Sequence, residues 1–368
     1  MKFIIKKEIL LIHIKKIVNI ITKNPIFPIL ENILININQD RLKLTSSNLE
    51  IEININISHK HYSFFKAGNT SISGKKLLHI CRNAPKETNL NFKLINKKIK
   101  IQIINNIFYL ITLSTKKFPK FPKYTEKKEI TIPQNLLKKI ISFTQFSIAN
   151  HDIRNCLNGL LLEYHNNYLY GVATDGHRLA MYKEKIFIPI NSFSMILSKK
   201  SILELSQLLA EKEKTVKIII NKNQILFCIK NISLITKIID GNFPNYHEII
   251  IKKPIKSIPV SLEKLKKALL RTSILCDTNF KGISLKFYNN LLKIRSKNQE
   301  DEESKDSFNI QYNDEKIKFS INIFYLLDVL NVLKSKIIYF ILDIPVIKIQ
   351  IQSLEEKNIF YIIMPLRL

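Results

Sequence analysis

Apolar and polar residues follow the same order at three places along the chain. Each place has an apolar start and a short apolar run. An Asn- or Asp-rich interruption and a second alternating run follow. The three segments are residues 30–48, 157–175 and 280–298. Alternation with a period of two on both sides of turn-forming residues is typical of a β-hairpin. The pattern therefore predicts three similar hairpins.

Segments of helical periodicity surround each predicted hairpin. Apolar residues at i, i+3 and i+4 form one stripe, and lysines occupy much of the remaining surface. The segments before the hairpins are residues 10–22, 133–148 and 261–275, and those after them begin at Ser73, Ser198 and Asn322. Ser261 is expected to cap the helix that follows it. Further β-rich runs lie between these markers.

The repeats divide the chain into three units of about 122 residues. We expect an α+β fold of three similar domains, each with two helices and antiparallel sheets, at residues 1–126, 127–250 and 251–368. The period is too long for a solenoid repeat. Similar domains joined by equivalent interfaces form an arc, and complementary ends would close it head to tail into a ring.

Composition excludes several classes of protein. The chain has 368 residues, of which 46% are hydrophobic, so it can bury a sizeable core and is not disordered. No apolar run reaches the roughly 18 residues that a membrane helix needs. Charged and polar residues interrupt the apolar N-terminus, which argues against a secretory signal. The four cysteines lie far apart without a CxxC motif, and we expect buried thiols in a reducing cytoplasm.

The net charge of +28 has two explanations. A polyanionic partner such as nucleic acid is one of them. The other is compositional drift, because a chain rich in Ile, Lys and Asn is typical of an AT-rich genome. The same bias makes scarce residues informative. Each of the seven glycines is expected at a position that needs a positive φ or a close backbone approach. The arginines at 154, 178 and 367 are expected to act as planar hydrogen-bond donors, a role that lysine cannot fill.

The segment Asp175-Gly-His-Arg178 concentrates candidate chemistry in four positions. Asp175 and His177 could form an acid–base pair, since residues i and i+2 at a strand end point the same way. No GxSxG, HExxH or complete P-loop motif accompanies them. His59 and His61 have a spacing seen in metal sites but no Cys or carboxylate cluster beside them. We therefore favour a binding role and expect no catalytic residue, cofactor or metal ion.

The chain resembles the bacterial sliding clamps, the beta subunits of DNA polymerase III. Collinear motifs carry the resemblance: FPILENILI (27–35), LNGLLLE (157–163), ATDGHRLA (173–180), IIDGNFPNY (238–246) and MPLRL (364–368). The resemblance implies a homodimeric ring whose helices surround duplex DNA. Such a ring tethers the polymerase without catalytic activity, and a clamp loader opens it. Contacts to DNA would then be to phosphates, independent of sequence and without any membrane partner.

The resemblance also implies a hydrophobic pocket that binds short peptides of the polymerase, the loader and repair proteins, including repair polymerases and mismatch-repair proteins. The implied pocket residues are Leu157, Thr174, Gly176, His177, Arg178, Leu179, Pro244, Asn322, Tyr325, Val346, Ile362, Met364, Pro365, Leu366 and Arg367. Arg178 and Arg367 would fix a peptide carbonyl or carboxylate through planar donors. His177 is expected to be a packed, hydrogen-bonded side chain.

Two further sets of residues follow from the resemblance. The implied DNA contacts are Lys23, Asn24, His151, Arg154, Lys199 and Lys200. The implied dimer interface comprises Lys76, Phe108, Leu110, Ile274, Leu275, Glu302 and Glu303. Lys-Lys pairs recur in the first helix of each repeat, at Lys15 and Lys16, Lys138 and Lys139, and Lys266 and Lys267. A further pair, Lys199 and Lys200, opens the second helix of the middle repeat. The recurrence indicates a shared basic wall.

The chain departs from the family pattern at several positions. Asn155 and Cys156 replace a polar, aromatic DNA-contacting loop, Lys305 interrupts an acidic stretch, and Glu248 stands where a basic residue is expected. The basic composition predicts stronger non-specific DNA adhesion than is typical of the family, with a steep salt dependence. An alternative function is a charge-driven DNA-coating protein of the same fold, which would need no intact apolar pocket.

Overall fold

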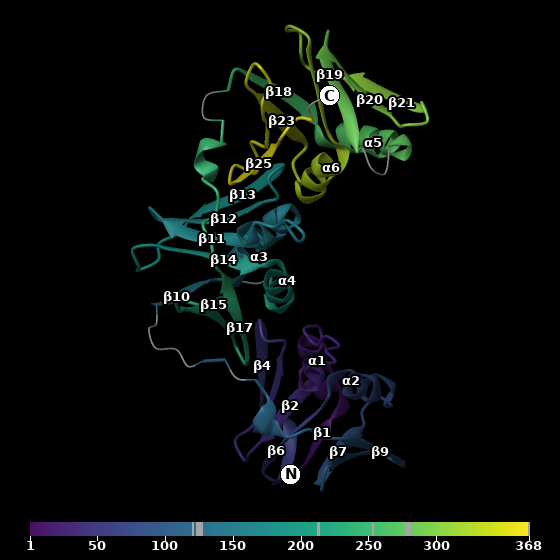
Figure 1. Ribbon diagram of the computed structural model, residues 1–368, viewed down its shortest axis with the longest axis vertical. Coiled ribbons are helices and arrows are strands. Elements are labelled where there is room, and N and C mark those ends of the chain that lie inside the picture. The colour runs from purple at the N-terminus through teal and green to yellow at the C-terminus, as the bar shows by residue number, and fades with distance from the viewer. Residues whose placement is uncertain (120, 123–127, 212–213, 252–253, 277–280, 367–368) are drawn as a thin grey trace. The chain divides into compact units, whose positions relative to one another are not determined.

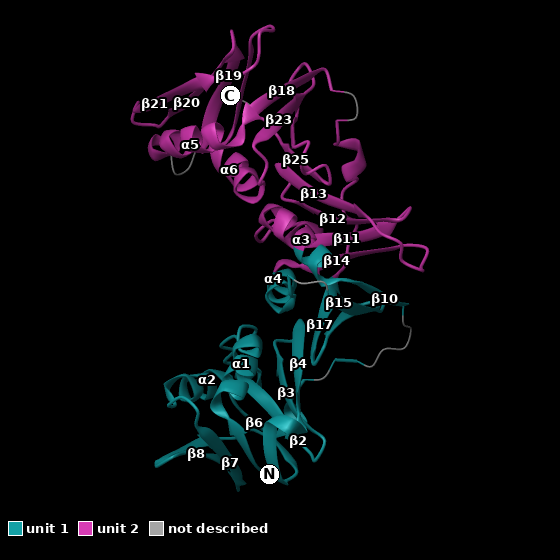
Figure 2. Cartoon of the chain, turned by 180° about the vertical axis from the view of Figure 1, so that it is seen from behind, with its two compact units in different colours: residues 1–138, 200–238 teal, residues 139–199, 239–368 magenta. Residues whose placement is uncertain are grey.

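The computed structural model describes the chain except for residues 120, 123–127, 212–213, 252–253, 277–280 and 367–368. The chain forms two compact units. Unit 1 comprises residues 1–138 and 200–238, and unit 2 comprises residues 139–199 and 239–368 (Figure 2). The chain passes between the units within α3 (Gln134–Thr144), α4 (Lys199–Leu208) and β17 (Ile232–Ile239). The three predicted domains divide the chain differently and stay a prediction.

Unit 1 contains two antiparallel sheets and the helices α1 (Lys7–Ile17) and α2 (Gly74–Asn83), which pack against each other (Figure 1). The first sheet has the order β5 (Tyr62–Lys66), β1 (Lys2–Lys6), β7 (Asn89–Ile95), β8 (Lys98–Ile103), β9 (Asn106–Ile111). The second has the order β10 (Lys128–Pro133), β15 (Thr215–Ile220), β16 (Gln224–Ile229), β17 (Ile232–Ile239), β4 (Ile51–Ser58), β3 (Arg41–Ser47), β2 (Asn32–Ile37), β6 (Gly68–Ser73).

Unit 2 also contains two antiparallel sheets, with the helices α5 (Leu262–Thr272) and α6 (Ile323–Val332) in mutual contact. One sheet has the order β18 (Lys256–Ser261), β23 (Ile337–Leu342), β24 (Ile349–Gln352), β25 (Ile359–Ile363), β13 (Arg178–Lys185), β12 (Tyr168–Thr174), β11 (Gly159–His165), β14 (Phe193–Ser198). The other has the order β21 (Glu303–Asn309), β20 (Leu291–Lys297), β19 (Gly282–Tyr288), β22 (Ile317–Asn322).

The three predicted hairpins are confirmed as β2–β3, β11–β12 and β19–β20. Two of them turn through Asn-Asn pairs. Asn166 and Asn167 have φ of 51° and 62°, and Asn289 and Asn290 have φ of 46° and 56°. Two consecutive residues with positive φ form the turn whose twist matches that of paired strands, and Asn tolerates that conformation better than most residues.

The six predicted helices are confirmed, but they are shorter than their periodicity predicts, and α1 is shifted toward the N-terminus, at Lys7–Ile17 where residues 10–22 were expected. Both α3 and α5 end at a threonine. The Thr144 hydroxyl donates to the Ile140 carbonyl oxygen at 2.6 Å, and the Thr272 hydroxyl donates to that of Ala268 at 2.5 Å. A hydroxyl that bonds to the carbonyl four residues back competes with the helical ladder. Ser261 caps α5 as predicted, accepting from the Lys264 amide at 3.4 Å.

The four cysteines are free thiols. Cys81 is buried, and burial raises its pKa to about 12. The prediction that all four are buried is wrong for Cys156, Cys228 and Cys276, which are partly exposed. Cys228 lies opposite Lys217 of β15, and the other two lie in or next to short turns, where packing is incomplete. Within the described residues, no helix is long and apolar enough to cross a membrane.

Candidate functional site

The turn between β12 and β13 is fixed by the side chain of Asp175. Its Oδ1 accepts the amides of His177 and Arg178, both at 3.0 Å, and its Oδ2 accepts from Arg178 Nε at 3.0 Å. Thr174 Oγ1 donates to the Arg178 carbonyl oxygen at 2.6 Å and accepts the Gly176 amide. Asp175 therefore shapes the turn, and the structure gives no hydrogen bond between the side chains of Asp175 and His177.

The guanidinium of Arg178 is engaged inside unit 2. Besides Asp175, Nη1 donates to Asp328 Oδ2 of α6 at 2.6 Å, and Nη2 donates to the Phe146 carbonyl oxygen at 2.6 Å. The group also lies 5.4 Å from the Phe146 ring centre and 4.4 Å from that of Tyr325. Its side chain is 11% exposed. This geometry ties β13 to α6, whereas the sequence predicted that these donors would face a bound peptide.

The C-terminal segment completes the site. β25 pairs with β13 so that Leu179 lies opposite Ile362. Beyond this strand, the Met364 amide donates to the His177 carbonyl oxygen at 2.9 Å. The Leu366 amide donates to the Ser320 carbonyl oxygen at 2.7 Å. Residues near position 178 and near position 364 are thus brought together by strand pairing.

A cavity of about 190 Å³ lies beside this turn. Its floor is apolar, because Leu179, Tyr246 and Ile362 belong to one buried cluster. The cavity is lined by Arg154, Leu157, Thr174, Gly176, Arg178, Leu179, Phe243, Pro244, Tyr246, Ile249, Ile362 and Met364. Eight of these are residues that the resemblance implied for the pocket.

The other predicted pocket residues have different positions. Asn322 caps α6 by accepting the Phe324 amide at 3.0 Å, and Tyr325 packs on Arg178. His177 is exposed, not packed as predicted, because it stands at the tip of the turn. Val346, Pro365 and Leu366 are partly buried and are not among the cavity-lining residues. Arg367 lies outside the described residues.

Arg154 lines the cavity, although the sequence assigned it to DNA contacts. Its Nε and Nη2 donate to the two carboxylate oxygens of Asp152 at 3.0 and 3.1 Å. These hydrogen bonds hold the pKa of Asp152 below its ordinary value. Gly176 has a φ of 88°, and a Cβ there would lie 2.9 Å from Arg154 Nη2. The absence of a side chain at 176 therefore lets Arg154 lie against the turn.

The sequence prediction missed Phe243, Tyr246 and Ile249 as lining residues. The FPNY end of the IIDGNFPNY motif, at 243–246, was the available signal, but only Pro244 was assigned from it. The Tyr246 hydroxyl donates to Glu163 Oε2 at 2.6 Å. Burial and this carboxylate raise the pKa of Tyr246. The bond anchors one wall of the cavity to β11.

The remaining predicted DNA contacts lie on surface segments. Lys199 Nζ donates to Asn150 Oδ1 at 2.7 Å, and burial lowers its pKa, so this amino group is partly used within the protein. Asn24 caps its own loop by accepting the Ile26 and Phe27 amides. Lys23 and His151 are exposed, and Lys200 is partly buried. Within the predicted basic wall, Lys138 pairs with Glu211 and Lys267 pairs with Glu263.

Four of the seven predicted dimer residues lie in or next to two edge strands. In unit 1, Phe108 and Leu110 belong to β9, the last strand of its sheet, and Lys76 is exposed on α2. In unit 2, β21 is the edge strand and begins at Glu303, directly after Glu302. Ile274, which follows α5, is 77% exposed, and Leu275 is partly buried. Both edges expose backbone groups available for pairing.

Comparison with known proteins gives matches along the whole chain. Residues 1–122, 131–245 and 247–367 match the N-terminal, central and C-terminal domains of the DNA polymerase III beta subunit. The chain is 40% identical to the beta sliding clamp of Buchnera aphidicola subsp. Rhopalosiphum padi, with 100% of both chains covered. It is 32% identical to that of Escherichia coli (strain K12), again over 100% of both.

Solved structures give the same result. A crystal structure of the DNA polymerase III subunit beta from Pseudomonas aeruginosa has a TM-score of 0.95 and 30% identity, with 100% of each chain covered. The DNA polymerase sliding clamp from Bacillus subtilis has a TM-score of 0.93 and 25% identity, covering 100% of this chain and 99% of that one. On this evidence the chain belongs to the family of bacterial DNA polymerase III beta subunits, the beta sliding clamps.

Proposed function

We propose that this chain is a non-catalytic processivity factor that encircles duplex DNA and tethers the replicative polymerase in the cytoplasm. The full-length match to sliding clamps is the observation that carries this proposal. The ring would contain two copies of the chain, each with domains at residues 1–126, 127–250 and 251–368. A sliding tether needs weak, sequence-independent phosphate contacts, and exposed lysines such as Lys15 and Lys139 suit that purpose.

The two free sheet edges support a head-to-tail dimer. β9 is rich in exposed apolar side chains, with Tyr109 57% and Ile111 71% exposed. Long, apolar edge strands are a liability in a monomer unless another strand covers them. Pairing β9 of one copy with β21 of a second copy would cover both edges. It would also bring Phe108 and Leu110 of one copy close to Ile274 of the other.

The cavity beside Arg178 supports a peptide-binding role. Its apolar floor would hold an aliphatic or aromatic side chain of a short peptide, and Arg154 at the rim would interact with a peptide carboxylate or carbonyl. The proposed partners are the replicative polymerase, the clamp loader and repair proteins. A charge-driven DNA-coating protein would have no use for this cavity, which argues against the alternative function.

Topological retention on DNA tests the tether. The protein is loaded with a clamp loader and ATP onto nicked circular DNA, washed in high salt, and the DNA is then cut once. We expect retention on circles and rapid loss after cutting, because a ring slides off an end. Equal release from circular and linear DNA at high salt would mean that binding is only electrostatic, and would contradict the proposal.

Substitution at the cavity tests the peptide site. Met364→Ala removes a lining side chain and should weaken binding of a clamp-binding peptide of the cognate polymerase by about tenfold or more. Leu354→Ala is the matched control, because Leu354 is 64% exposed and does not line the cavity. Fluorescence anisotropy of the labelled peptide gives both affinities. Equal affinities for the two variants would remove the cavity from the proposal.

A further inference from the structure

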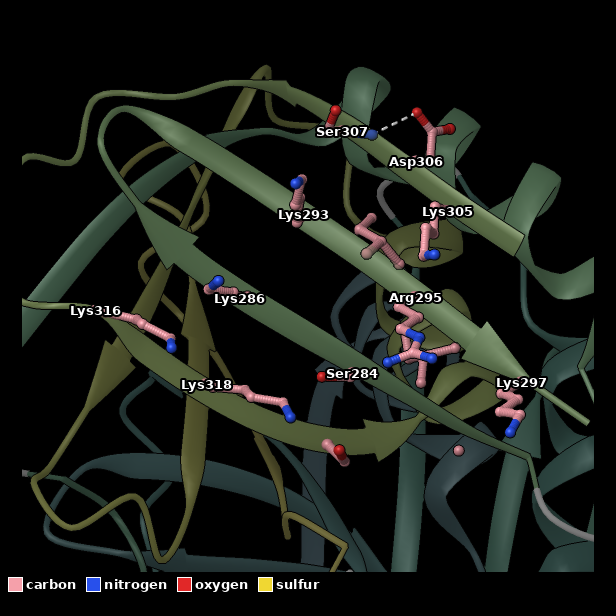
Figure 3. Close-up of a pocket in the computed structure, with 14 residues that line it drawn as sticks. Ser284, Lys286, Lys293, Arg295, Lys297, Lys305, Asp306, Ser307, Lys316 and Lys318 are labelled. Carbon is pink, nitrogen blue, oxygen red and sulfur yellow. Dashed lines mark hydrogen bonds between the residues drawn. The ribbon is translucent and has the colours of Figure 1, made fainter. Parts of the chain in front are cut away.

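The sheet β21–β20–β19–β22 in unit 2 has two chemically different faces. Leu285, Phe287 and Ile294 are buried on one face, and α5 packs against β20 and β21. The alternate residues along the same strands are lysine, arginine and serine. We call the other face the basic trough; Figure 3 labels Ser284, Lys286, Lys293, Arg295, Lys297, Lys305, Ser307, Lys316 and Lys318 on it, and Ser320 also lines it.

Three lysines of the basic trough form a row across adjacent strands. Lys286 of β19 lies directly opposite Lys293 of β20 and directly opposite Lys318 of β22. Neighbouring strands are about 4.8 Å apart, so the row places like charges side by side. Like charges at directly opposed positions destabilise a sheet. Repulsion within this row therefore lowers the stability of the unbound protein, and a bound polyanion would remove that repulsion.

Carboxylates neutralise only one end of the basic trough. Glu303 pairs with both Arg295 and Lys305, and Asp301 pairs with Lys297. Asp306 is held from α5 by two nitrogens of Arg271, at 2.6 and 2.7 Å. By contrast, among the described residues no ion pair to a carboxylate involves the four remaining lysines, Lys286, Lys293, Lys316 and Lys318. Their charges remain available to a ligand.

The shape of the basic trough favours a flexible chain. It encloses a cavity of about 670 Å³ whose floor is formed by the strands. Tyr288 is not a lining residue but stands beside the basic trough at the turn end of β19, with Lys286 Nζ 4.3 Å and Lys293 Nζ 5.8 Å from its ring centre. A cationic groove with an aromatic ring next to it is typical of surfaces that bind single-stranded nucleic acid. A single strand is flexible enough to follow the depression, whereas bending a duplex into it costs free energy.

From these observations we propose that the basic trough binds the phosphate backbone of single-stranded DNA without sequence preference. An acidic peptide is the competing ligand. Stable peptide docking relies on desolvated apolar anchors, and the apolar residues of these strands face the core instead. A polar, strongly positive surface matches nucleic acid better. This inference goes beyond the proposed function, because it concerns a sheet face and requires neither ring closure nor the peptide cavity.

The test compares two triple variants of the full chain that lose the same charge. One carries Lys286→Gln, Lys293→Gln and Lys318→Gln. The control carries Lys334→Gln, Lys336→Gln and Lys357→Gln at exposed positions of unit 2 outside the basic trough. Anisotropy of a short, labelled, linear single-stranded oligonucleotide is measured over a series of salt concentrations without the loader. Contacts elsewhere on the protein are common to both variants, so the difference isolates the basic trough.

We expect the trough variant to bind more weakly and its slope of log K against log salt to be smaller in magnitude by about 2, since each single-strand phosphate contact contributes roughly 0.7. The control should keep the slope of the unmodified chain. Identical slopes for the two variants would overturn the proposal. The proposal would also be overturned if the trough variant lost affinity only for a poly-glutamate peptide or only for linear duplex DNA. Thermal unfolding should show that the trough variant is at least as stable as the control, because its lysine row is relieved.

Discussion

Arg178 of β13 and Asp328 of α6 are joined by a hydrogen-bonded ion pair with an Nη1–Oδ2 distance of 2.6 Å. Arg178 also donates to Asp175 and to the Phe146 carbonyl oxygen. One guanidinium thus joins a turn, a helix and the segment after α3. The turn that carries Gly176 and Thr174 lines the cavity. The shape of the cavity therefore depends on the hydrogen bonds that Arg178 makes to Asp175, Asp328 and Phe146.

Arg178→Lys should destabilise unit 2 by about 1–2 kcal/mol, because a lysine cannot replace the planar donors and leaves partly buried acceptors with fewer hydrogen bonds. The same variant should weaken peptide binding, since the turn loses its fixed position. Asp314→Ala is the control: it removes an ion pair with Lys256 in which Asp314 is 57% exposed, and it should cost less than about 1 kcal/mol. Urea unfolding measures both. Equal costs would refute the structural role of Arg178.

Gly176→Ala should reduce peptide binding at the cavity more than it reduces the stability of unit 2. The φ of 88° costs an alanine about 1–2 kcal/mol, and its Cβ would lie 2.9 Å from Arg154 Nη2. Gly241→Ala is the control, because Gly241 has a φ of 133° but its Cβ would meet only Cys156, at 3.6 Å. We expect peptide affinity to fall in the first variant and to change little in the second. Unchanged affinity at 176 would show that Arg154 takes no part.

The sequence predicted elements and repeats well because those depend on local pattern. Apolar alternation and Asn-Asn turns defined the hairpins, and helical stripes defined the helices. The resemblance carried by motifs such as ATDGHRLA predicted eight of the residues that line the cavity, but the sequence could not assign the acceptors that bind the Arg178 guanidinium. One of them, Asp328, lies 150 positions away in the chain and carries no motif. Likewise, the pairing of Arg154 with Asp152 became visible only in the loop geometry.

Glu52 links the stability of unit 1 to pH. It lies in β4, is 8% exposed, and accepts from Asn54 Nδ2 at 2.8 Å. Burial raises the pKa of Glu52, and this effect is larger than the lowering by the Asn54 hydrogen bond and by Lys43. A raised folded-state pKa means that the folded chain holds the proton more tightly than the unfolded chain. The stabilisation is therefore present below the unfolded pKa and is lost as pH rises through the folded pKa.

Glu52→Gln should accordingly raise the unfolding temperature near pH 7 and have little effect near pH 4, where the glutamate of the unmodified chain is also neutral. Glutamine keeps the oxygen that accepts from Asn54. Glu204→Gln is a parallel variant, because burial also raises the pKa of Glu204. Thermal unfolding followed by circular dichroism at the two pH values gives the difference. A gain of the same size at both values would exclude the ionisation of Glu52 as its cause.

The proposed dimer depends on the edge strand β9, where Phe108 is 37% exposed. Phe108→Asp would place a charge in the proposed interface and should weaken dimerisation by about 30-fold, the effect of losing roughly 2 kcal/mol at an anchor residue. Phe187→Asp is the matched control, since Phe187 is 80% exposed in unit 2 and outside both edge strands. Sedimentation over a range of concentrations measures the two dissociation constants. If both variants dimerise like the unmodified chain, β9 is not the interface, and retention on circular DNA would have to arise from a different pair of surfaces.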